Sequence, residues 1–321
     1  MQNLFDPAIL FFVVGVLAGA MRSNLEIPPA ISRFLSLYLL MALGLKGGFA
    51  LSHSGLTANV GISLGAAMLL AICIPLLGYW FLKHFVSGFD AAAVAATYGS
   101  VSAVTFVTAV QYLENQQVAY GGHMAAAMAL MESPAIIMAV VFANTLRSKP
   151  NMTQAKPGFS IGKVLHESFT DGAQLLLLGA MVVGLVTGDA GKAAMQPFSG
   201  DLFKGMLSFF LLDMGLMAAR NLPQVKGKSP ALIAYAVLGP VLHAGLALGL
   251  AYLLDLPVGD GALLMVLAAS ASYIAVPAVL RYAVPEASPS LYFGLSLGVT
   301  FPLNILFGIP VYVALAKAVL I

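Results

Sequence analysis

The chain has 321 residues, of which 60% are hydrophobic and only 9% are charged, whereas soluble domains average about half apolar and a quarter charged residues. Its repeated apolar stretches are long enough to cross a bilayer and predict a polytopic membrane protein. The formal net charge of +2 indicates no class of partner, and a single cysteine, Cys73, excludes both an intramolecular disulfide framework and a cysteine-based metal cluster.

Apolar runs bounded by charged residues, Pro or Gly predict an all-α fold with ten transmembrane helices. The expected spans are Ala8–Met21, Ile31–Leu51, Val60–Phe85, Asp90–Leu113, Gly122–Leu146, Gly172–Thr187, Leu202–Asn221, Ala231–Leu254, Gly259–Ala283 and Ser290–Val319. The first run has the length of a signal peptide. Because an acidic residue and no Lys or Arg precede it, and more spans follow, we interpret it as the first span.

The two halves of the chain resemble each other, which predicts a duplicated unit. The stretch SRFLSLYLLMALGLKGG from Ser32 matches FKGMLSFFLLDMGLMAA from Phe203 in length and in the placement of small residues. We therefore divide the chain into a first five-helix repeat (1–146), a connector (147–171) and a second five-helix repeat (172–321). An odd number of spans per repeat inserts the two copies in opposite orientations, and such 5+5 inverted repeats are typical of secondary transporters.

The distribution of basic residues predicts the orientation in the membrane. With the N-terminus outside, eleven basic residues fall on the inner side: Arg22, Arg33, Lys83, Arg147, Lys149, Lys156, Lys163, Arg220, Lys226, Lys228 and Arg281. The outer side then keeps four, Lys46, Lys192, Lys204 and Lys317. Cytoplasmic loops carry an excess of Lys and Arg, so we expect both termini outside and the connector at 147–163 in the cytoplasm.

Small and polar residues interrupt spans four and nine. The stretches are TYGSVSAVT at 97–105 and AASASYIAVP at 268–277, where a lipid-facing helix would carry Leu, Ile or Val. A broken helix is tolerated at this depth only where it is buried or lines a cavity. Breaks at matching positions of two halves indicate a transporter's binding site. The alternative is that small residues serve close helix packing, but two equivalent positions favour a site.

Each break would expose the N-terminus of a half-helix, near Ser102 in span four and near Ser272 in span nine. Free N–H groups and the positive end of the helix dipole favour an anion there, while freed carbonyls and hydroxyls could hold Na⁺. The candidate substrate-binding residues are Gly99, Ser100, Val101, Ser102, Ala269, Ser270, Ala271, Ser272 and Tyr273. The candidate sodium ligands are Ser102, Thr105, Glu132, Ser270, Ser272 and Asn304.

Polar residues inside spans are functional candidates, because they are expensive in lipid. Glu132 either tunes sodium or proton coupling or lies at the membrane interface as a snorkelling acid. Asn304 is either an ion ligand or an interhelical hydrogen-bonding group. Lys46 and Asp213 occupy neighbouring turns of the equivalent spans two and seven, and we predict a structural ion pair between them.

The sequence lacks the zinc-protease motif HExxH and the phosphate loop GxxxxGK[ST] of ATP-driven transporters. Its two GxSxG matches, at 61–65 and 294–298, lie inside predicted spans and not at a strand-to-helix turn. We therefore expect no enzymatic activity, no cofactor apart from Na⁺ as the coupling ion, and no nucleic-acid partner. An ion gradient is left as the energy source.

The order of several short segments resembles one known family over nearly the whole chain. These segments are IPPAIS, LGLKGG, YGSVSAVT, MESPA followed by VVFAN, AASAS and VPEASPS, and together they resemble the SbtA-type sodium-dependent bicarbonate transporters. The resemblance implies Na⁺-coupled HCO₃⁻ uptake across the bacterial inner membrane and a homotrimer surrounded by membrane lipid. It also implies a site between Ser100–Ser102 and Ala269–Ser272, and a PII-like cytoplasmic regulator as in cyanobacterial members.

Our leading hypothesis is a secondary active transporter that takes up a small monovalent anion, with bicarbonate first among the candidates, together with Na⁺ by alternating access. Two alternatives stay open. One is an organic-anion/sodium symporter of the bile-acid-symporter type, which would have a roomier cavity. The other is a non-transporting membrane sensor or scaffold, which would have a dry, closed interior.

Overall fold

The computed structural model describes residues 6–55, 57–147, 162, 166 and 171–320, and these residues form helices and no strand. The connector expected at 147–171 lies almost entirely outside them. The first half contains α1 (Pro7–Ala20), α2 (Pro29–Ser54), α3 (Ala58–Leu82), α4 (Gly88–Gly99), α5 (Ala103–Asn115) and α6 (Met124–Arg147). The second contains α8 (Gly172–Met195), η2 (Gln196–Asp201), α9 (Phe203–Asn221), η3 (Leu222–Val225), α10 (Pro230–Leu253), α11 (Val258–Ala269), α12 (Ala275–Ala283), α13 (Pro289–Leu295), η4 (Ser296–Thr300), α14 (Phe301–Leu303), η5 (Asn304–Gly308) and α15 (Ile309–Val319).

Seven helical stretches of the described residues are long and apolar enough to cross a membrane, and three of them combine consecutive elements: α4 with α5, α8 with α9, and α13 with α15. The helices α1 and α11 are shorter and apolar. The expected all-α, multi-pass membrane architecture is therefore confirmed. The expected sixth span differs most from the structure. The sequence predicts its end at Thr187, but α8 continues to Met195 past a kink at Gly188. The φ of 51° at this residue lies in the left-handed region, which glycine adopts without a steric cost.

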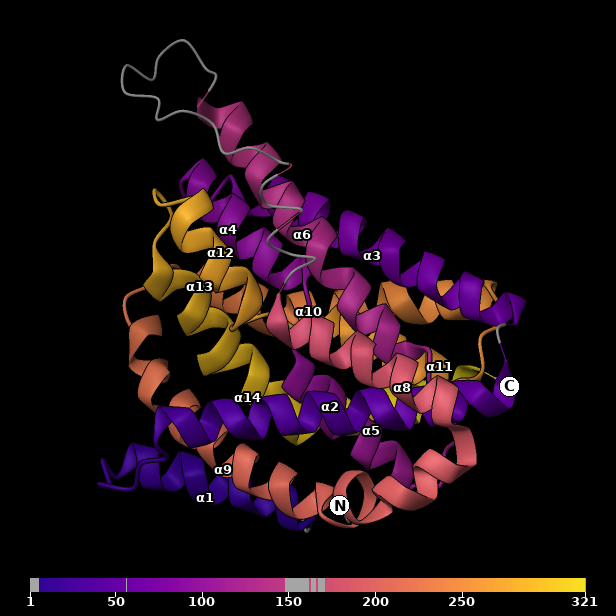
Figure 1. Cartoon of the computed structure of the whole chain (residues 1–321). Coiled ribbons are helices and arrows are strands. Elements are labelled where there is room, and N and C mark those ends of the chain that lie inside the picture. Colours follow the sequence, from indigo (N-terminus) through magenta and orange to yellow (C-terminus); the bar gives the residue numbers. More distant parts are fainter. Residues whose placement is uncertain (1–5, 56, 148–161, 163–165, 167–170, 321) are drawn as a thin grey trace.

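Four helices, α1, α2, α8 and α9, form one side of the molecule, and we call them the frame. Figure 1 shows α1 beside α9 along the lower edge, with α2 and α8 above them. Glycines allow these close pairings: Gly15 of α1 lies against the Leu212 carbonyl of α9, and Gly44 of α2 lies against the Leu177 carbonyl of α8. A Cβ at either glycine would overlap the opposing backbone. We call α3 to α6 together with α10 to α15 the bundle.

The bundle contains both interrupted spans, as the sequence predicts. The first interruption separates α4, which ends at Gly99, from α5, which begins at Ala103. The second separates α11, which ends at Ala269, from α12, which begins at Ala275. Pro277 lies in the first turn of α12, where its missing N–H leaves no helical hydrogen bond unmade.

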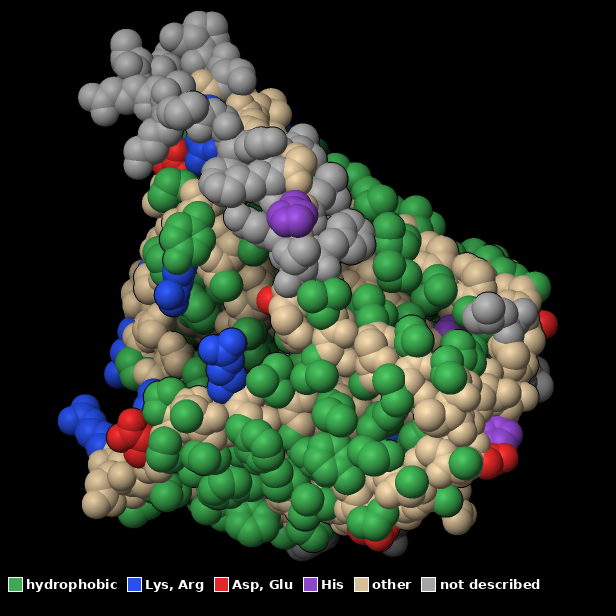
Figure 2. Space-filling model, viewed as in Figure 1, with side chains coloured by type: hydrophobic (Ala, Val, Ile, Leu, Met, Phe, Trp, Pro, Cys, Tyr) green, Lys and Arg blue, Asp and Glu red, His purple; other side chains and the backbone are tan. Residues whose placement is uncertain are grey.

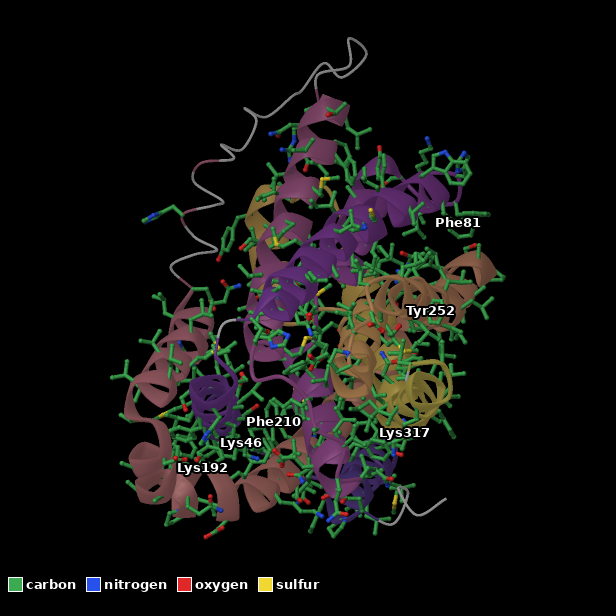
Figure 3. The ribbon with its side chains drawn as sticks, turned by 90° about the vertical axis from the view of Figure 1, so that its right-hand side faces the viewer. Lys46, Phe81, Lys192, Phe210, Tyr252 and Lys317 are labelled. Carbon is green, nitrogen blue, oxygen red and sulfur yellow. The ribbon has the colours of Figure 1, made fainter. Side chains whose placement is uncertain are left out.

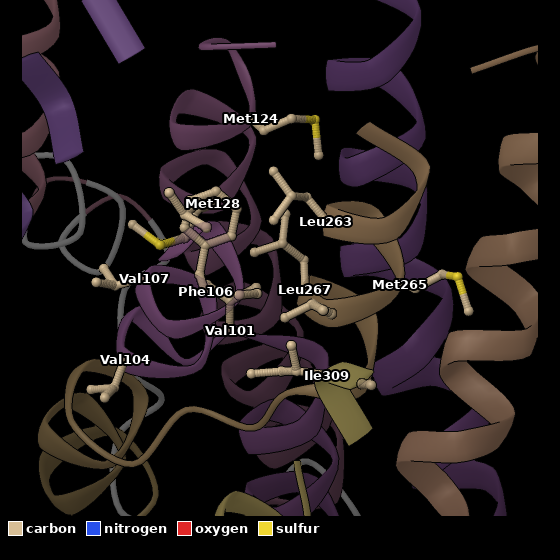
Figure 4. Close-up of a cluster of buried hydrophobic side chains, with 14 of the residues drawn as sticks. Val101, Val104, Phe106, Val107, Met124, Met128, Leu263, Met265, Leu267 and Ile309 are labelled. Atoms are coloured by element: carbon tan, nitrogen blue, oxygen red, sulfur yellow. The ribbon is translucent and has the colours of Figure 1, made fainter. Parts of the chain in front are cut away.

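The two breaks lie against each other and exchange hydrogen bonds. The N–H of Ser102 donates to the hydroxyl of Ser270 at 3.0 Å, and the N–H of Ser272 donates to the carbonyl of Thr97 at 2.8 Å. Figure 4 shows Val101 of the first break packed in an apolar cluster with side chains of α5, α6, α11 and α15. Each interruption thus supplies an acceptor for one backbone N–H that the other one frees, and such partners are needed at this depth in a membrane.

The predicted ion pair between Lys46 and Asp213 is wrong. Lys46 binds Glu114 of α5 at 3.0 Å, whereas Asp213 interacts with Ser32 and Arg220. The reason is helix pairing, because α2 packs along α8 and α9 packs along α1. Equivalent turns of α2 and α9 therefore do not place these two side chains face to face.

Candidate functional site

A cavity of about 210 Å³ lies between the frame and the bundle. Its walls come from α2 and α8 of the frame and from α5, α6, α12 and both breaks of the bundle. The lining residues are Ser36, Leu40, Val101, Ser102, Ala103, Val104, Met128, Ala129, Glu132, Ile136, Asp171, Ala173, Gln174, Leu177, Ser272, Tyr273, Ile274, Ala275, Ala278 and Val279. Figure 2 shows the surface hollowed between the upper helices and α2, with basic side chains nearby.

The cavity brings together some of the residues that the sequence singles out. Five of them line it: Val101, Ser102, Glu132, Ser272 and Tyr273. The others are buried around the crossing of the breaks without lining the cavity: Gly99, Ser100, Thr105, Ala269, Ser270, Ala271 and Asn304.

Two helix N-termini face the cavity. Its wall includes Ala103 and Val104, the first residues of α5, and Ala275, the first residue of α12. Ser102 and Ser272 each accept one backbone N–H of the following half-helix, at 3.2 and 3.3 Å. Within the described chain, the N–H groups of the three lining residues have no hydrogen-bond partner. The cavity therefore meets free donors at the positive ends of two helix dipoles.

The carbonyl end of α11, on the other side of its break, is already satisfied by side chains. The Asn304 amide donates to the carbonyl of Ala269 at 2.8 Å, and the hydroxyl of Tyr312 donates to the Asn304 carbonyl oxygen at 3.1 Å. Asn304 thus holds the end of a half-helix in place.

The carbonyl end of α4 is not satisfied in this way. Among the described residues, no hydrogen bond reaches the carbonyls of Tyr98 and Gly99. The hydroxyl of Ser100 is also buried without a partner, at 1% exposure. Oxygen atoms left unpaired in an apolar interior are costly, and this cluster of them is chemically suited to a hard cation such as Na⁺.

The polar wall of the cavity contains residues that the sequence reading missed. The carboxylate of Glu132 on α6 accepts a hydrogen bond from the side-chain amide of Gln174 on α8. Ser36 and Asp171 also line the cavity. The signal for Gln174 was present, because it is a single amide at the start of the apolar run GAQLLLLGAMVV.

A second gap between the frame and the bundle is almost closed, with a volume of about 10 Å³. It lies between α1 and α9 of the frame and α5 and α15 of the bundle. Its lining residues are Asp6, Ala8, Ile9, Thr108, Gln111, Tyr112, Asn115, Leu207, Ile305 and Ile309.

Broken spans that meet beside a cavity are the arrangement found in secondary transporters. The sequence profile of the Na⁺-dependent bicarbonate transporter superfamily matches residues 7–317, and the chain belongs to this superfamily. The resemblance found in the sequence is thereby confirmed. A comparison with curated proteins gives no match.

Proposed function

We propose that this protein takes up bicarbonate together with Na⁺ by alternating access. The observation that carries the proposal is the cavity shared by the N-termini of α5 and α12. The free N–H groups of Ala103, Val104 and Ala275 would donate to the oxygens of one small anion. Two helix dipoles would favour its negative charge without a buried basic side chain.

The size of the cavity favours a small substrate over the alternatives. A volume of about 210 Å³ is below the roughly 300–1,000 Å³ of pockets that enclose drug-sized ligands. A symporter of the bile-acid type would need a larger space. A scaffold with a dry, closed interior would lack a cavity that reaches both breaks.

We place the coupling Na⁺ at the carbonyl end of α4. The unpaired hydroxyl of Ser100 and the free carbonyls of Tyr98 and Gly99 supply oxygen atoms there, and the C-terminal ends of half-helices commonly coordinate Na⁺ in transporters. Ser102 and Thr105 lie at the start of α5, just across the break. Asn304 would act indirectly in this scheme, by positioning the end of α11.

Repeated contacts support the 5+5 inverted repeat. In the first turn of α4, Asp90 accepts the N–H of Ser288 at 2.8 Å, and in the first turn of α11, Asp260 accepts the N–H of Gly121 at 2.5 Å. Each carboxylate thus binds the segment that precedes the last span of the opposite half. The frame repeats the same exchange, since α1 packs on α9 while α8 packs on α2.

The proposed orientation places the open cavity toward the cytoplasm of a bacterial cell. Figure 2 shows basic side chains gathered along the left edge of the molecule, as expected for the inner side. The cavity lies near the start of α8, which follows the basic connector, whereas the gap of about 10 Å³ lies near the N-terminus. The structure would then represent the inward-open state, with the bundle moving against the frame. The homotrimer and the PII-like regulator stay predictions.

The decisive test is uptake of labelled bicarbonate by proteoliposomes with an inward Na⁺ gradient or a matched K⁺ gradient. We expect uptake to be at least tenfold faster with Na⁺. Equal uptake in both would reject sodium coupling, and inhibition by organic carboxylates but not by small inorganic anions would favour the organic-anion symporter. Absence of any anion uptake by folded protein would reject a transport function.

A further inference from the structure

We propose that Lys46 and Glu114 form a latch on the outer side of the molecule, which holds the bundle against the frame and separates when the closed gap opens. This inference rests on the proposed alternating-access function, because it names the contact that keeps one of the two states closed. It concerns residues outside the cavity and outside both breaks.

The Lys46–Glu114 contact joins three helices. The ammonium group of Lys46 on α2 lies 3.0 Å from both carboxylate oxygens of Glu114 in the last turn of α5. The hydroxyl of Tyr120 donates to the same carboxylate at 3.0 Å, and the ammonium group lies 4.0 Å from the centre of the Phe203 ring on α9. A single lysine therefore connects α2 and α9 of the frame to α5 of the bundle.

A second polar contact holds the same turn of α5. The amide of Asn115 donates to the carboxylate of Asp6 at 2.9 Å, and Lys204 binds the same Asp6 oxygen at 2.9 Å. Asp6 is the N-cap of α1, and both Asp6 and Asn115 line the gap of about 10 Å³. Both polar contacts of this turn of α5 therefore lie where the frame and the bundle would have to separate.

The latch is accessible to solvent and weak enough to open. The side chains of Lys46 and Glu114 are 20% and 32% exposed, and both line a polar pocket of about 440 Å³. Figure 3 shows Lys46 on α2 and Lys192 on α8 on the same side of the molecule. Partly exposed pairs of this kind change an equilibrium by at most about fivefold. Such a contact biases a transition without blocking it.

The test measures how readily the closed gap is reached from outside. Thr108 lines this gap and is 5% exposed, so Thr108→Cys in a Cys73→Ser background reports its opening to a membrane-impermeant maleimide. We expect Lys46→Met and Glu114→Gln each to raise the labelling rate about threefold to fivefold. The charge-swapped double variant, Lys46→Glu with Glu114→Lys, should return the rate toward that of the parent.

The chain offers a matched control. His53 and Asp189 form a contact of 2.8 Å between α2 and α8, so both partners belong to the frame. His53→Gln and Asp189→Asn should leave labelling of Thr108→Cys unchanged. A similar increase in these variants would show general loosening and overturn the latch. Unchanged labelling in both Lys46→Met and Glu114→Gln would also overturn it.

The dependence of the labelling rate on the external salt concentration tests the same Lys46–Glu114 contact independently. Raising salt from 0.1 M to 1 M shortens the Debye length from about 10 Å to 3 Å, and this should increase labelling of the parent but not of Lys46→Met. An equal salt effect in both proteins would contradict the latch. Labelling requires neither bicarbonate nor sodium, so the latch can fail while uptake is normal, and uptake can fail while labelling still responds.

Discussion

Under the proposed inverted repeat, the open cavity and the closed gap are lined by equivalent parts of the two halves. By the sequence match of 32–48 with 203–219, Ser36 of α2 lines the cavity and its counterpart Leu207 of α9 lines the gap. The half-helices that follow the two breaks contribute Ala278 of α12 to the cavity and Thr108 of α5 to the gap. The volumes of the two regions nevertheless differ, at about 210 and about 10 Å³. Under the proposed repeat, equivalent helices line an open region on one side and a closed region on the other, as the proposed alternating access requires.

Polar side chains join the frame to the bundle at the edge of both regions. Across the closed gap, Asp6 and Asn115 bind each other from frame to bundle. In the open cavity, Glu132 and Gln174 make the corresponding contact between α6 and α8. A polar contact between the frame and the bundle therefore crosses each region, and the proposed alternating access would have to rearrange both contacts. Such contacts can be changed one at a time.

The largest effect is expected at the helix crossings of the frame. Gly15→Leu would drive a side chain into the backbone of α9, and Gly44→Leu would do the same to α8. We expect both variants to lose most of their folded protein, as measured by monodisperse yield in detergent. Gly65→Leu on α3, where nothing lies within 4 Å, should fold normally. Loss of folding in only one of the two crossing variants would contradict their equivalence.

The next largest effect is expected in the site itself. Ser102→Val removes the hydroxyl that caps α5, a loss of about 1 kcal/mol, and adds bulk beside the free N–H groups of the cavity wall. Uptake should fall at least tenfold while the melting temperature changes little. Ser63→Ala is the control, because Ser63 is a fully buried serine of α3 whose hydroxyl has no partner. A normal transport rate in Ser102→Val would show that the break of span four is not part of the substrate site.

The spans and their breaks could be predicted because their signals are local. Apolar length and the small polar residues around Ser102 and Ser272 are read directly from the chain, and the structure places half-helix starts close to both. The partner of Lys46 could not be predicted, because it depends on which helices pack together and how each is rotated. The sequence offers Asp213 by repeat equivalence, while the fold supplies Glu114.

The role of Asn304 shows a second limit of the sequence. An amide side chain in an apolar span indicates that it binds a polar partner, but the sequence does not show whether this partner is an ion or a backbone group. In the structure, the nearby end of α11 provides the Ala269 carbonyl. Gln174 was missed for a related reason, because its side-chain amide binds Glu132 on another helix, and this pairing is not visible in the sequence.

A smaller effect tests the contrast between the two regions directly. Ala278 is exposed in the open cavity, whereas Thr108 is buried in the closed gap. In a Cys73→Ser background, Ala278→Cys should react with an impermeant maleimide at least fivefold faster from the cytoplasmic side than from outside. Thr108→Cys should react slowly from both sides. Faster reaction of Ala278→Cys from outside would reverse the proposed orientation.

The smallest effect concerns the two aspartates that bind the opposite half. Asp90→Asn and Asp260→Asn keep an oxygen acceptor for Ser288 and Gly121 but lose its charge. Hydrogen bonds to charged groups contribute about 1 kcal/mol more than neutral ones, so each variant should melt a few degrees lower. The change should be larger for Asp260, which is 3% exposed and lies 3.6 Å from His123. Destabilisation by one variant alone would show that the duplicated contact no longer serves the same purpose in both halves.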